Sequence, residues 1–356
     1  MIELTKGNVL KADAEALVNT VNCVGFMGKG IALQFKKAYP ENFDAYHKAC
    51  AAGEVQPGRM FIFHLHSMLN PKYVVNFPTK RDWRANSRYE DIESGLKALV
   101  AEVRRLGIRS IAVPPLGCGL GGLDWSKVRP MIERAFAPLP NVRVLLFEPA
   151  GAPAAKAMPV GTARPKLTVA RALFIRIMDQ YASQAYRLTL LEIQKLAYFL
   201  QEAGQPLKLK YQAGHYGPYA PNLNKVLEVL ERHYTSGYGD TQQPDVEIEL
   251  LEGAAQQAEA FLSGHAPEHE RLKRLSRLIE GFETPYGLEL LSSVHWLAAH
   301  ANPPAEDRDQ AVEGIAAWND RKRRMFRPEH IRLGWDRLQA QGWLPGSGLN
   351  SSRHIP

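Results

Sequence analysis

The chain reads Val18-Asn19-Thr20-Val21-Asn22-Cys23-Val24-Gly25-Phe26-Met27-Gly28-Lys29-Gly30-Ile31-Ala32 where a strand-like apolar run gives way to a helical pattern. The run before Asn22 is typical of a buried strand, and the residues after Gly30 are typical of a helix. Gly28 and Gly30 would let backbone N–H groups approach an anion, which the N-terminus of the helix also attracts. This stretch predicts an α/β fold with an anion site where a strand ends.

A second glycine-rich loop follows a later apolar run. It reads Pro114-Pro115-Leu116-Gly117-Cys118-Gly119-Leu120-Gly121-Gly122-Leu123-Asp124-Trp125, with four glycines in six residues. Ligands of open α/β sheets bind beyond the carboxyl ends of the strands, where both loops are expected to lie. Two such loops are typical of a diphosphate held by backbone N–H groups from two sides. Neither loop has the glycine pattern of nucleoside triphosphatases or of dinucleotide oxidoreductases, which disfavours both classes.

Strand-like and helix-like patterns alternate through the first 150 residues. Apolar runs rich in β-formers occupy 16–21, 60–65, 73–77, 110–113 and 142–147, and helical patterns occupy 30–38, 41–51, 89–106 and 125–136. This alternation predicts an α/β sandwich on a largely parallel sheet over residues 1–150.

The composition changes after residue 150. Residues 151–166 are rich in Pro and Ala and are predicted to form a semi-extended linker. Helical patterns at 168–182, 189–203, 222–233, 267–282 and 329–341 then predict a mainly helical second domain over 167–356. Thr189 and Glu192 form a candidate capping box at the start of one of these helices.

Charge and cysteine content limit the cellular setting and the partners. Residues 1–150 hold 20 Lys and Arg against 14 Asp and Glu, a net charge of +6 out of +7 for the chain. That balance fits a polyanionic partner, and it also fits an ordinary protein surface. Three widely spaced cysteines without a C-x-x-C pair indicate a reducing, cytoplasmic setting. Because no apolar run reaches 18 residues, no membrane span is expected.

The two glycine loops resemble those of macrodomains, a family that binds ADP-ribose in a cleft of this kind. The segment Asn76-Phe77-Pro78-Thr79-Lys80-Arg81-Asp82-Trp83, followed by a helix from Tyr89, is similar to the branch that includes the terminal ADP-ribose protein glycohydrolase. The chain as a whole resembles the DarG-type macrodomain antitoxins. That family implies a three-layer α/β/α macrodomain with a mixed sheet, which removes ADP-ribose from thymine bases of single-stranded DNA. It also implies a C-terminal domain that binds the partner ADP-ribosyltransferase toxin, DarT.

The resemblance assigns the reaction to Lys80 and Asn22, without a cofactor. An amine beside the anomeric carbon can act as a nucleophile, as a base, or as an electrostatic stabiliser of an oxocarbenium-like transition state. Partial burial and the neighbouring Arg81 are expected to lower the pKa of this lysine. Asn22 aligns with an asparagine that contacts the distal ribose, although asparagines are also common in turns. Gly121 stands where the related protein glycohydrolase carries an assisting aspartate, and Asp124 is expected to cap the next helix instead.

The resemblance also implies which residues contact the ligand. The ADP-ribose contacts are expected at Asn8, Val9, Asn19, Gly28, Gly30, Ile31, Gly117, Cys118, Gly119, Leu120, Gly121 and Phe147. Asn8 stands where many macrodomains carry an adenine-reading aspartate, and Phe147 is a candidate adenine platform or a core residue. Lys29, Arg81, Trp83 and Arg84 are expected to contact DNA, since cations interleaved with an aromatic ring suit a single strand.

Other candidate sites are weaker. His64 and His66 have no Asp, Glu or Cys nearby in sequence, so no metal site is expected there. Cys23 and Cys118 lack an activating histidine within sequence reach and are interpreted as packing residues.

The second domain is polarised in charge. Residues 240–259 carry six acids and no Lys or Arg, whereas 319–327 are strongly basic. Such runs are usually solvated faces, and the alternative is a docking surface on which the acids imitate DNA. The segment His215-Tyr216-Gly217-Pro218-Tyr219, with Gln194 and Lys195 upstream, resembles helical Panacea-type antitoxin domains.

Two other functions fit the same predicted fold. The first is hydrolysis of ADP-ribose esters on protein carboxylates, which the glycine at position 121 mildly disfavours. The second is a non-enzymatic ADP-ribose reader joined to an interaction domain, which would bind ADP-ribose without turnover.

Overall fold

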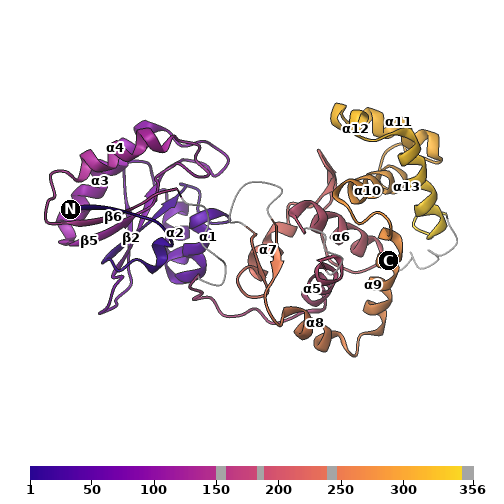
Figure 1. The fold of residues 1–356 in the computed structure, drawn as a ribbon, viewed down its shortest axis with the longest axis horizontal. Helices are drawn as coiled ribbons and strands as arrows, with labels where there is room; N and C mark the ends of the chain where they lie inside the picture. The colour runs from indigo at the N-terminus through magenta and orange to yellow at the C-terminus, as the bar shows by residue number, and fades with distance from the viewer. Residues whose placement is uncertain (150–157, 183–187, 239–246, 347–356) are drawn as a thin grey trace. The chain divides into compact units, whose positions relative to one another are not determined.

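The computed structural model describes residues 1–149, 158–182, 188–238 and 247–346 (Figure 1). The chain forms two compact units, of which the first comprises Met1–Arg164 and the second begins at Pro165. Among the residues described, no helix is both long and apolar enough to cross a lipid bilayer.

The first unit is built on a six-stranded sheet. Its strand order is β1 (Ile2–Thr5), β6 (Arg143–Phe147), β5 (Ser110–Val113), β2 (Ala16–Val21), β4 (Tyr73–Pro78) and β3 (Phe61–His64). All neighbours are parallel except β3 and β4, which are antiparallel. The mixed, largely parallel macrodomain sheet expected from the sequence is therefore confirmed. The edge strand β1 was not predicted.

Helices cover both faces of this sheet. They are α1 (Gly30–Ala38), α2 (Pro40–Ala51), α3 (Tyr89–Leu106) and α4 (Trp125–Phe136). Successive residues of β2 point to opposite faces, so Val18 packs with the apolar residues of α3 and α4, and Leu17 packs with Phe35 of α1. The three layers expected from the resemblance are present.

The end of the predicted linker packs on the first unit. The backbone N–H groups of Gly161 and Thr162 donate to the carbonyl of Lys37, at 2.7 and 3.2 Å. A Cβ at Gly161 would lie 2.4 Å from the carbonyl oxygen of Ala38, so only glycine fits this approach. Met158 is buried within the same apolar cluster as α1. Residues 158–162 therefore belong to the first unit, and residues 150–157 lie outside the described part of the chain.

The second unit is mainly helical, as predicted. Its helices are α5 (Val169–Ala182), α6 (Leu190–Glu202), α7 (Leu223–Leu230), α8 (Ala254–Leu262), α9 (Ala266–Ile279), α10 (Pro285–Ala299), α11 (Arg308–Trp318), α12 (Asp320–Met325) and α13 (Pro328–Ala340). Two short strand pairs accompany them: β7 (Gln212–Gly214) with β8 (Gly217–Tyr219), and β9 (Thr235–Ser236) with β10 (Glu249–Leu250). The capping box of Thr189 and Glu192 is present at the start of α6.

The basic run at 319–327 is only partly a solvated face. Lys322 is fully buried, and its Nζ donates to Glu289 at 2.7 Å and to Ser293 at 2.9 Å. Arg321 donates to both carboxylate oxygens of Glu289, at 2.7 and 3.1 Å. Burial opposes the ionisation of Glu289, but these hydrogen bonds and the Lys322 charge outweigh it and lower its pKa. Two of the four consecutive cations are therefore structural.

The Panacea-like motif residues join α6 to the β7–β8 hairpin. The Gln194 side chain accepts from the Ala220 N–H at 3.0 Å and donates to the Ala220 carbonyl at 3.2 Å. Lys195 Nζ donates to the Pro218 carbonyl at 2.7 Å. Burial, together with the nearby Lys322 charge, lowers the pKa of Lys195 to about 7. In this structure the motif residues hold α6 and the β7–β8 hairpin together.

One glycine determines how closely α3 approaches the sheet, and it supplies a test of the packing. A Cβ at Gly95 would lie 2.3 Å from Cζ of Phe77 on β4. We expect Gly95→Ala to cost about 1–3 kcal/mol of stability because the ring must leave its packed position. Thermal unfolding of the full chain, followed by circular dichroism, measures the change.

Gly119→Ala is the matched control, because no heavy atom lies within 4 Å of a Cβ built there. An unchanged midpoint for Gly95→Ala would show that Phe77 moves aside without cost.

Candidate active site

The two glycine loops meet beyond the ends of neighbouring strands. The first follows β2, the second follows β5, and these strands pair in parallel. Gly30 has a φ of +58°, and a Cβ there would lie 3.2 Å from Cδ1 of Leu120 in the second loop. Gly117 has a φ of +71°, and a Cβ there would lie 2.9 Å from Leu123. Both loops thus need glycine, for their backbone conformation and for their close approach to neighbouring side chains.

Lys80 connects the end of β4 to the second glycine loop. Its Nζ donates to the carbonyl of Leu120 at 3.0 Å and to that of Trp83 at 3.3 Å. Burial lowers the pKa of Lys80 from its ordinary value, and the negative charge of Asp82 opposes this shift. The ammonium therefore lies beside the loops and is held by two backbone carbonyls.

Arg81 does not take part in lowering that pKa, contrary to the expectation from the sequence. Its guanidinium makes two hydrogen bonds to Asp91 of α3, at 2.8 and 3.0 Å. Its backbone carbonyl accepts from the Cys23 N–H at 3.1 Å, which extends the pairing of β2 and β4 into the loops. The guanidinium is thus engaged in fixing the end of β4 to a helix.

The Asn22 amide closes the first glycine loop. Its Oδ1 accepts from the N–H groups of Val24 and Phe26, at 3.0 and 3.2 Å, and its Nδ2 donates to the Phe26 carbonyl at 2.6 Å. The Tyr46 hydroxyl donates to the Asn22 carbonyl at 2.7 Å. In this structure Asn22 therefore shapes the loop that would carry the ligand.

Asn19, which lies on the strand β2 and precedes Asn22, also has a structural role. It is fully buried, and its Nδ2 donates to Oδ1 of Asn76 on β4 at 3.0 Å. Asn76 in turn donates to Asn42 of α2 at 2.7 Å. This chain of amides ties β2, β4 and α2 together and leaves Asn19 no exposed surface for ADP-ribose.

The space for an acid at position 121 is filled by Ser87. A Cβ at Gly121 would lie 2.2 Å from Oγ of Ser87 and 2.4 Å from the carbonyl oxygen of Gly117. The Ser87 N–H also donates to the Gly121 carbonyl at 3.0 Å. A carboxylate here would require a different loop. Asp124 instead caps α4 through the Ser126 N–H at 2.9 Å, as the sequence predicts.

The predicted adenine contacts lie near the ends of β1 and β6, on the side of the sheet that is remote from β4 and Lys80. Asn8 and Phe147 both line a cavity of about 400 Å³. Asn8 Oδ1 accepts from the Leu10 N–H at 2.9 Å, and its Nδ2 lies 2.9 Å from the sulfur of Met158. Phe147 is 6% exposed, so it is a core residue that also borders this cavity, and Val9 is buried beside it.

The remaining predicted contacts lie in the two loops. Gly28 and Lys29 directly precede α1, Ile31 lies in its first turn, and Gly117, Cys118, Gly119 and Leu120 belong to the second loop. Lys29 directly precedes α1, and burial lowers its pKa. Burial raises the pKa of Cys23 to about 11 and that of Cys118 to about 12, so both thiols stay protonated at neutral pH.

An exposed pair of aromatic side chains lies next to Lys80, and only one of the two was predicted from the sequence to contact a ligand. Trp83 is 43% exposed and stacks on Phe26, which is 48% exposed, with ring centroids 5.7 Å apart. The Arg84 guanidinium lies over the Trp83 ring, 4.7 Å from its centroid. Trp83 and Arg84 were predicted to contact DNA, but Phe26 is a lone aromatic within a glycine loop, and no pattern distinguishes it there.

Several known proteins are similar to this chain in sequence or structure. Residues 18–132 match the Macro domain family. A DNA ADP-ribosyl glycohydrolase of Thermus aquaticus is 45% identical over 97% of this chain and 94% of its own length. A DNA ADP-ribosyl transferase–DNA ADP-ribosyl glycohydrolase fusion protein of Thermosipho africanus is 35% identical over 42% of each chain. The solved macrodomain of Mycobacterium tuberculosis DarG is 53% identical, with 42% of this chain and 99% of that one covered and a TM-score of 0.42.

The similarity that shows the family extends over both units of the chain. The Thermus relative is similar over nearly the whole length of the two proteins, and the matched Macro domain includes Lys80 and both glycine loops. The motifs had indicated the same family. The chain belongs to the DarG-type DNA ADP-ribosyl glycohydrolase family.

Proposed function

We propose that the first unit hydrolyses the N-glycosidic bond between ADP-ribose and a thymine base of single-stranded DNA, with Lys80 as the catalytic group. The observation that carries this proposal is the hydrogen bond from Lys80 Nζ to the Leu120 carbonyl, at 3.0 Å. It holds an amine at the place where the two glycine loops meet. Backbone N–H groups of these loops would bind the pyrophosphate and direct the anomeric carbon toward that amine.

The two carbonyls around Lys80 favour its charged form, so we assign the reaction to the ammonium. The bond between the anomeric carbon and the base nitrogen breaks, and its electron pair goes to the nitrogen. The nitrogen takes a proton from Lys80. Water adds to the oxocarbenium-like carbon and gives a proton back to the neutral amine. The products are free ADP-ribose and the unmodified base, the enzyme regains its ammonium, and no covalent intermediate forms.

The glycine at position 121 supports a lysine that acts without an assisting acid. Ser87 occupies the space that a side chain there would need. Two of the acids that follow Lys80 in sequence have other partners, since Asp82 binds the Arg84 N–H at 2.8 Å and Asp91 binds Arg81. These partners, together with the glycine at position 121, favour a lysine that acts without a two-residue exchange.

The aromatic pair of Phe26 and Trp83 fits the DNA part of the substrate. An exposed ring with a cation stacked on it suits a base and its neighbouring phosphate. Because Lys80 Nζ bonds to the Trp83 carbonyl at 3.3 Å, a base on this ring would lie close to the reacting bond. A thymine attached to ADP-ribose has to be unpaired to reach such a site.

The second part of the proposal is that the C-terminal unit neutralises an ADP-ribosyltransferase toxin by direct contact. The Thermosipho relative's name joins a transferase and a glycohydrolase in one chain, which supports a functional pairing. Glu247, Glu249 and Glu252 are exposed around β10. An enzyme that modifies DNA needs a cationic surface for the phosphates, which these acids would complement. Asp240 and Asp245 of the predicted acidic stretch lie outside the described residues.

The experiment that tests the enzyme is release of ADP-ribose from a modified oligonucleotide. We expect Lys80→Ala to reduce turnover by about 100-fold or more, the usual contribution of a positioned proton donor. Binding of ADP-ribose, measured by calorimetry, should persist. Lys97→Ala is the control, since Lys97 forms an exposed pair with Glu93 on α3.

The pH dependence of the wild type distinguishes the charged from the neutral amine. Burial places the pKa of Lys80 below 10.5. If the ammonium acts, turnover is full below that pKa and falls as the pH rises through it. A rate that rises through the same range would contradict this role. Turnover that Lys80→Ala leaves intact would remove Lys80 altogether, and binding without any turnover would favour an ADP-ribose reader.

A second variant tests the DNA contact. We expect Trp83→Ala to weaken binding of the modified oligonucleotide by about 5- to 150-fold, because stacking on one base contributes about 1–3 kcal/mol. Affinity for free ADP-ribose should not change, which fluorescence polarisation of both ligands can show. Leu69→Ala, at another exposed apolar side chain, is the control. Equal losses for both ligands would place Trp83 in the ADP-ribose cleft instead.

A charge reversal tests the toxin contact. We expect Glu247→Lys, Glu249→Lys and Glu252→Lys together to weaken toxin binding at least tenfold, because three attractive charges become repulsive. Glu306→Lys, Glu313→Lys and Glu329→Lys make the same change in net charge at other exposed sites of the unit. Similar losses in the two triple variants would show that only the overall charge matters.

A further inference from the structure

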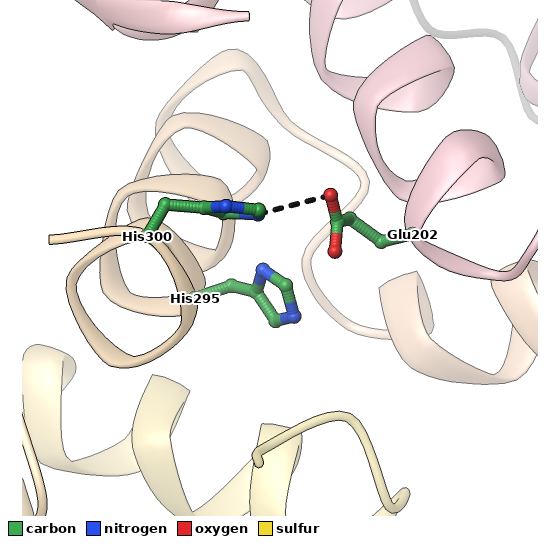
Figure 2. A group of neighbouring side chains, drawn as sticks. All are labelled: Glu202, His295 and His300. Carbon is green, nitrogen blue, oxygen red and sulfur yellow. Dashed lines mark hydrogen bonds and ion pairs between the residues drawn. The ribbon is translucent and has the colours of Figure 1, made fainter. Parts of the chain in front are cut away.

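Two imidazoles and a carboxylate converge in the second unit, apart from any residue of the proposed reaction. Glu202 is the last residue of α6, His295 lies in α10, and His300 caps the C-terminus of α10. One possible ligand atom from each lies within 4.8 Å of the others (Figure 2). His300 Nε2 lies 3.0 Å from Oε1 of Glu202. The set arises because α6 and α10 pack against each other.

The orientation of His295 suits a ligand. Its Nε2 lies 3.1 Å from the Trp343 carbonyl, which can only accept, so Nε2 carries the proton. This leaves Nδ1 with its lone pair, which accepts from the Tyr198 hydroxyl at 2.7 Å. Histidine ligands of metals are commonly fixed in this way, by donation from the second ring nitrogen to a backbone carbonyl. A bound cation would displace the Tyr198 proton from Nδ1.

A cavity bordered by Glu202 and His295 provides access and room for another ligand. Its volume is about 190 Å³, and Glu202, His295, Arg274 and Trp343 are among its lining residues. The Trp343 indole N–H is buried and has no hydrogen-bond partner among the described residues. The Arg274 guanidinium lies over the Trp343 ring, 4.4 Å from its centroid. These two groups could donate hydrogen bonds to a small anion or a water molecule in the cavity.

We propose that Glu202, His295 and His300 bind a divalent transition-metal ion of the zinc type, with the remaining position open to water or a small anion in the cavity. Two imidazoles and one carboxylate are a ligand set that such ions accept. The 3.0 Å between Glu202 and His300 is close to the ligand–ligand separation of about 3.3 Å that zinc bond lengths imply. His300 has a side chain 32% exposed at a helix end, so a rotation of that side chain can close the remaining distance. The ion would join the ends of α6 and α10.

Cobalt titration of the full chain tests the proposal. After removal of metals with a chelator, Co²⁺ should bind with one equivalent per chain, give visible absorption bands, and be displaced by Zn²⁺. We expect His300→Ala and Glu202→Gln each to weaken Co²⁺ binding at least tenfold, since loss even of an outer partner commonly costs 10- to 100-fold. Zn²⁺ should also raise the thermal midpoint of the wild type, and not that of His300→Ala.

His330→Ala is the matched control. His330 Nδ1 also pairs with a tyrosine hydroxyl, that of Tyr286 at 2.8 Å, but it is not part of the three-residue set. Binding should persist in this variant and in one with both His64 and His66 replaced by Ala. No saturable absorption, or equal affinity in the wild type and His300→Ala, would overturn the site. His300 lies at an exposed helix end, so His300→Ala decides the outcome even if Glu202→Gln fails to fold.

Discussion

The parallel pairing of β2 with β4 and β5 is the constraint on which the candidate active site depends. It places two loops and the end of β4 at one edge of the sheet, and the Cys23 N–H and Thr79 N–H extend the pairing past the last strand residues. Lys80 then reaches across to the Leu120 carbonyl. A lysine at a strand end is ordinarily a flexible surface group, and here two carbonyls fix its position. The position of the proposed catalytic amine is thus a consequence of backbone pairing.

The same close packing restricts the chemistry. Gly30 meets Leu120, and Gly121 meets Ser87, so neither position has room for a side chain, whereas Gly119 faces open space. At those two positions the loops present backbone groups, which can bind phosphate oxygens and bring little acid–base chemistry of their own. Lys80 adds a titratable group at the junction of the loops, and burial lowers its pKa. This composition supports the proposed hydrolysis with one proton donor over an exchange between two residues.

The sequence predicted the parts of this fold that have a regular period or a glycine pattern. The strands of the sheet interior, the two loops and α3 were found because alternating apolar runs and 3.6-residue spacing report burial directly. The strand β1 was missed because four residues at a sheet edge carry too short a pattern. The helix α10 was missed because it is buried on nearly all sides and so lacks an amphipathic period. The roles of Asn19, Asn22 and Arg81 were also not predictable, because their partners come from other elements.

Charged runs in the sequence of the second unit do not all form charged surfaces in the structure. Lys322 and Arg321 look like surface cations in the sequence, but both are bound to the buried Glu289. Lys195 lies close enough to Lys322 for that charge to help lower its pKa to about 7. The acids around β10, by contrast, stay exposed. The buried acids Glu192, Glu231 and Glu289 balance the buried cations Lys195, Arg232 and Lys322. Burial therefore changes where charge appears on the surface of this unit and not its net amount, so a run of charged residues must be located in the structure before it is assigned to a partner.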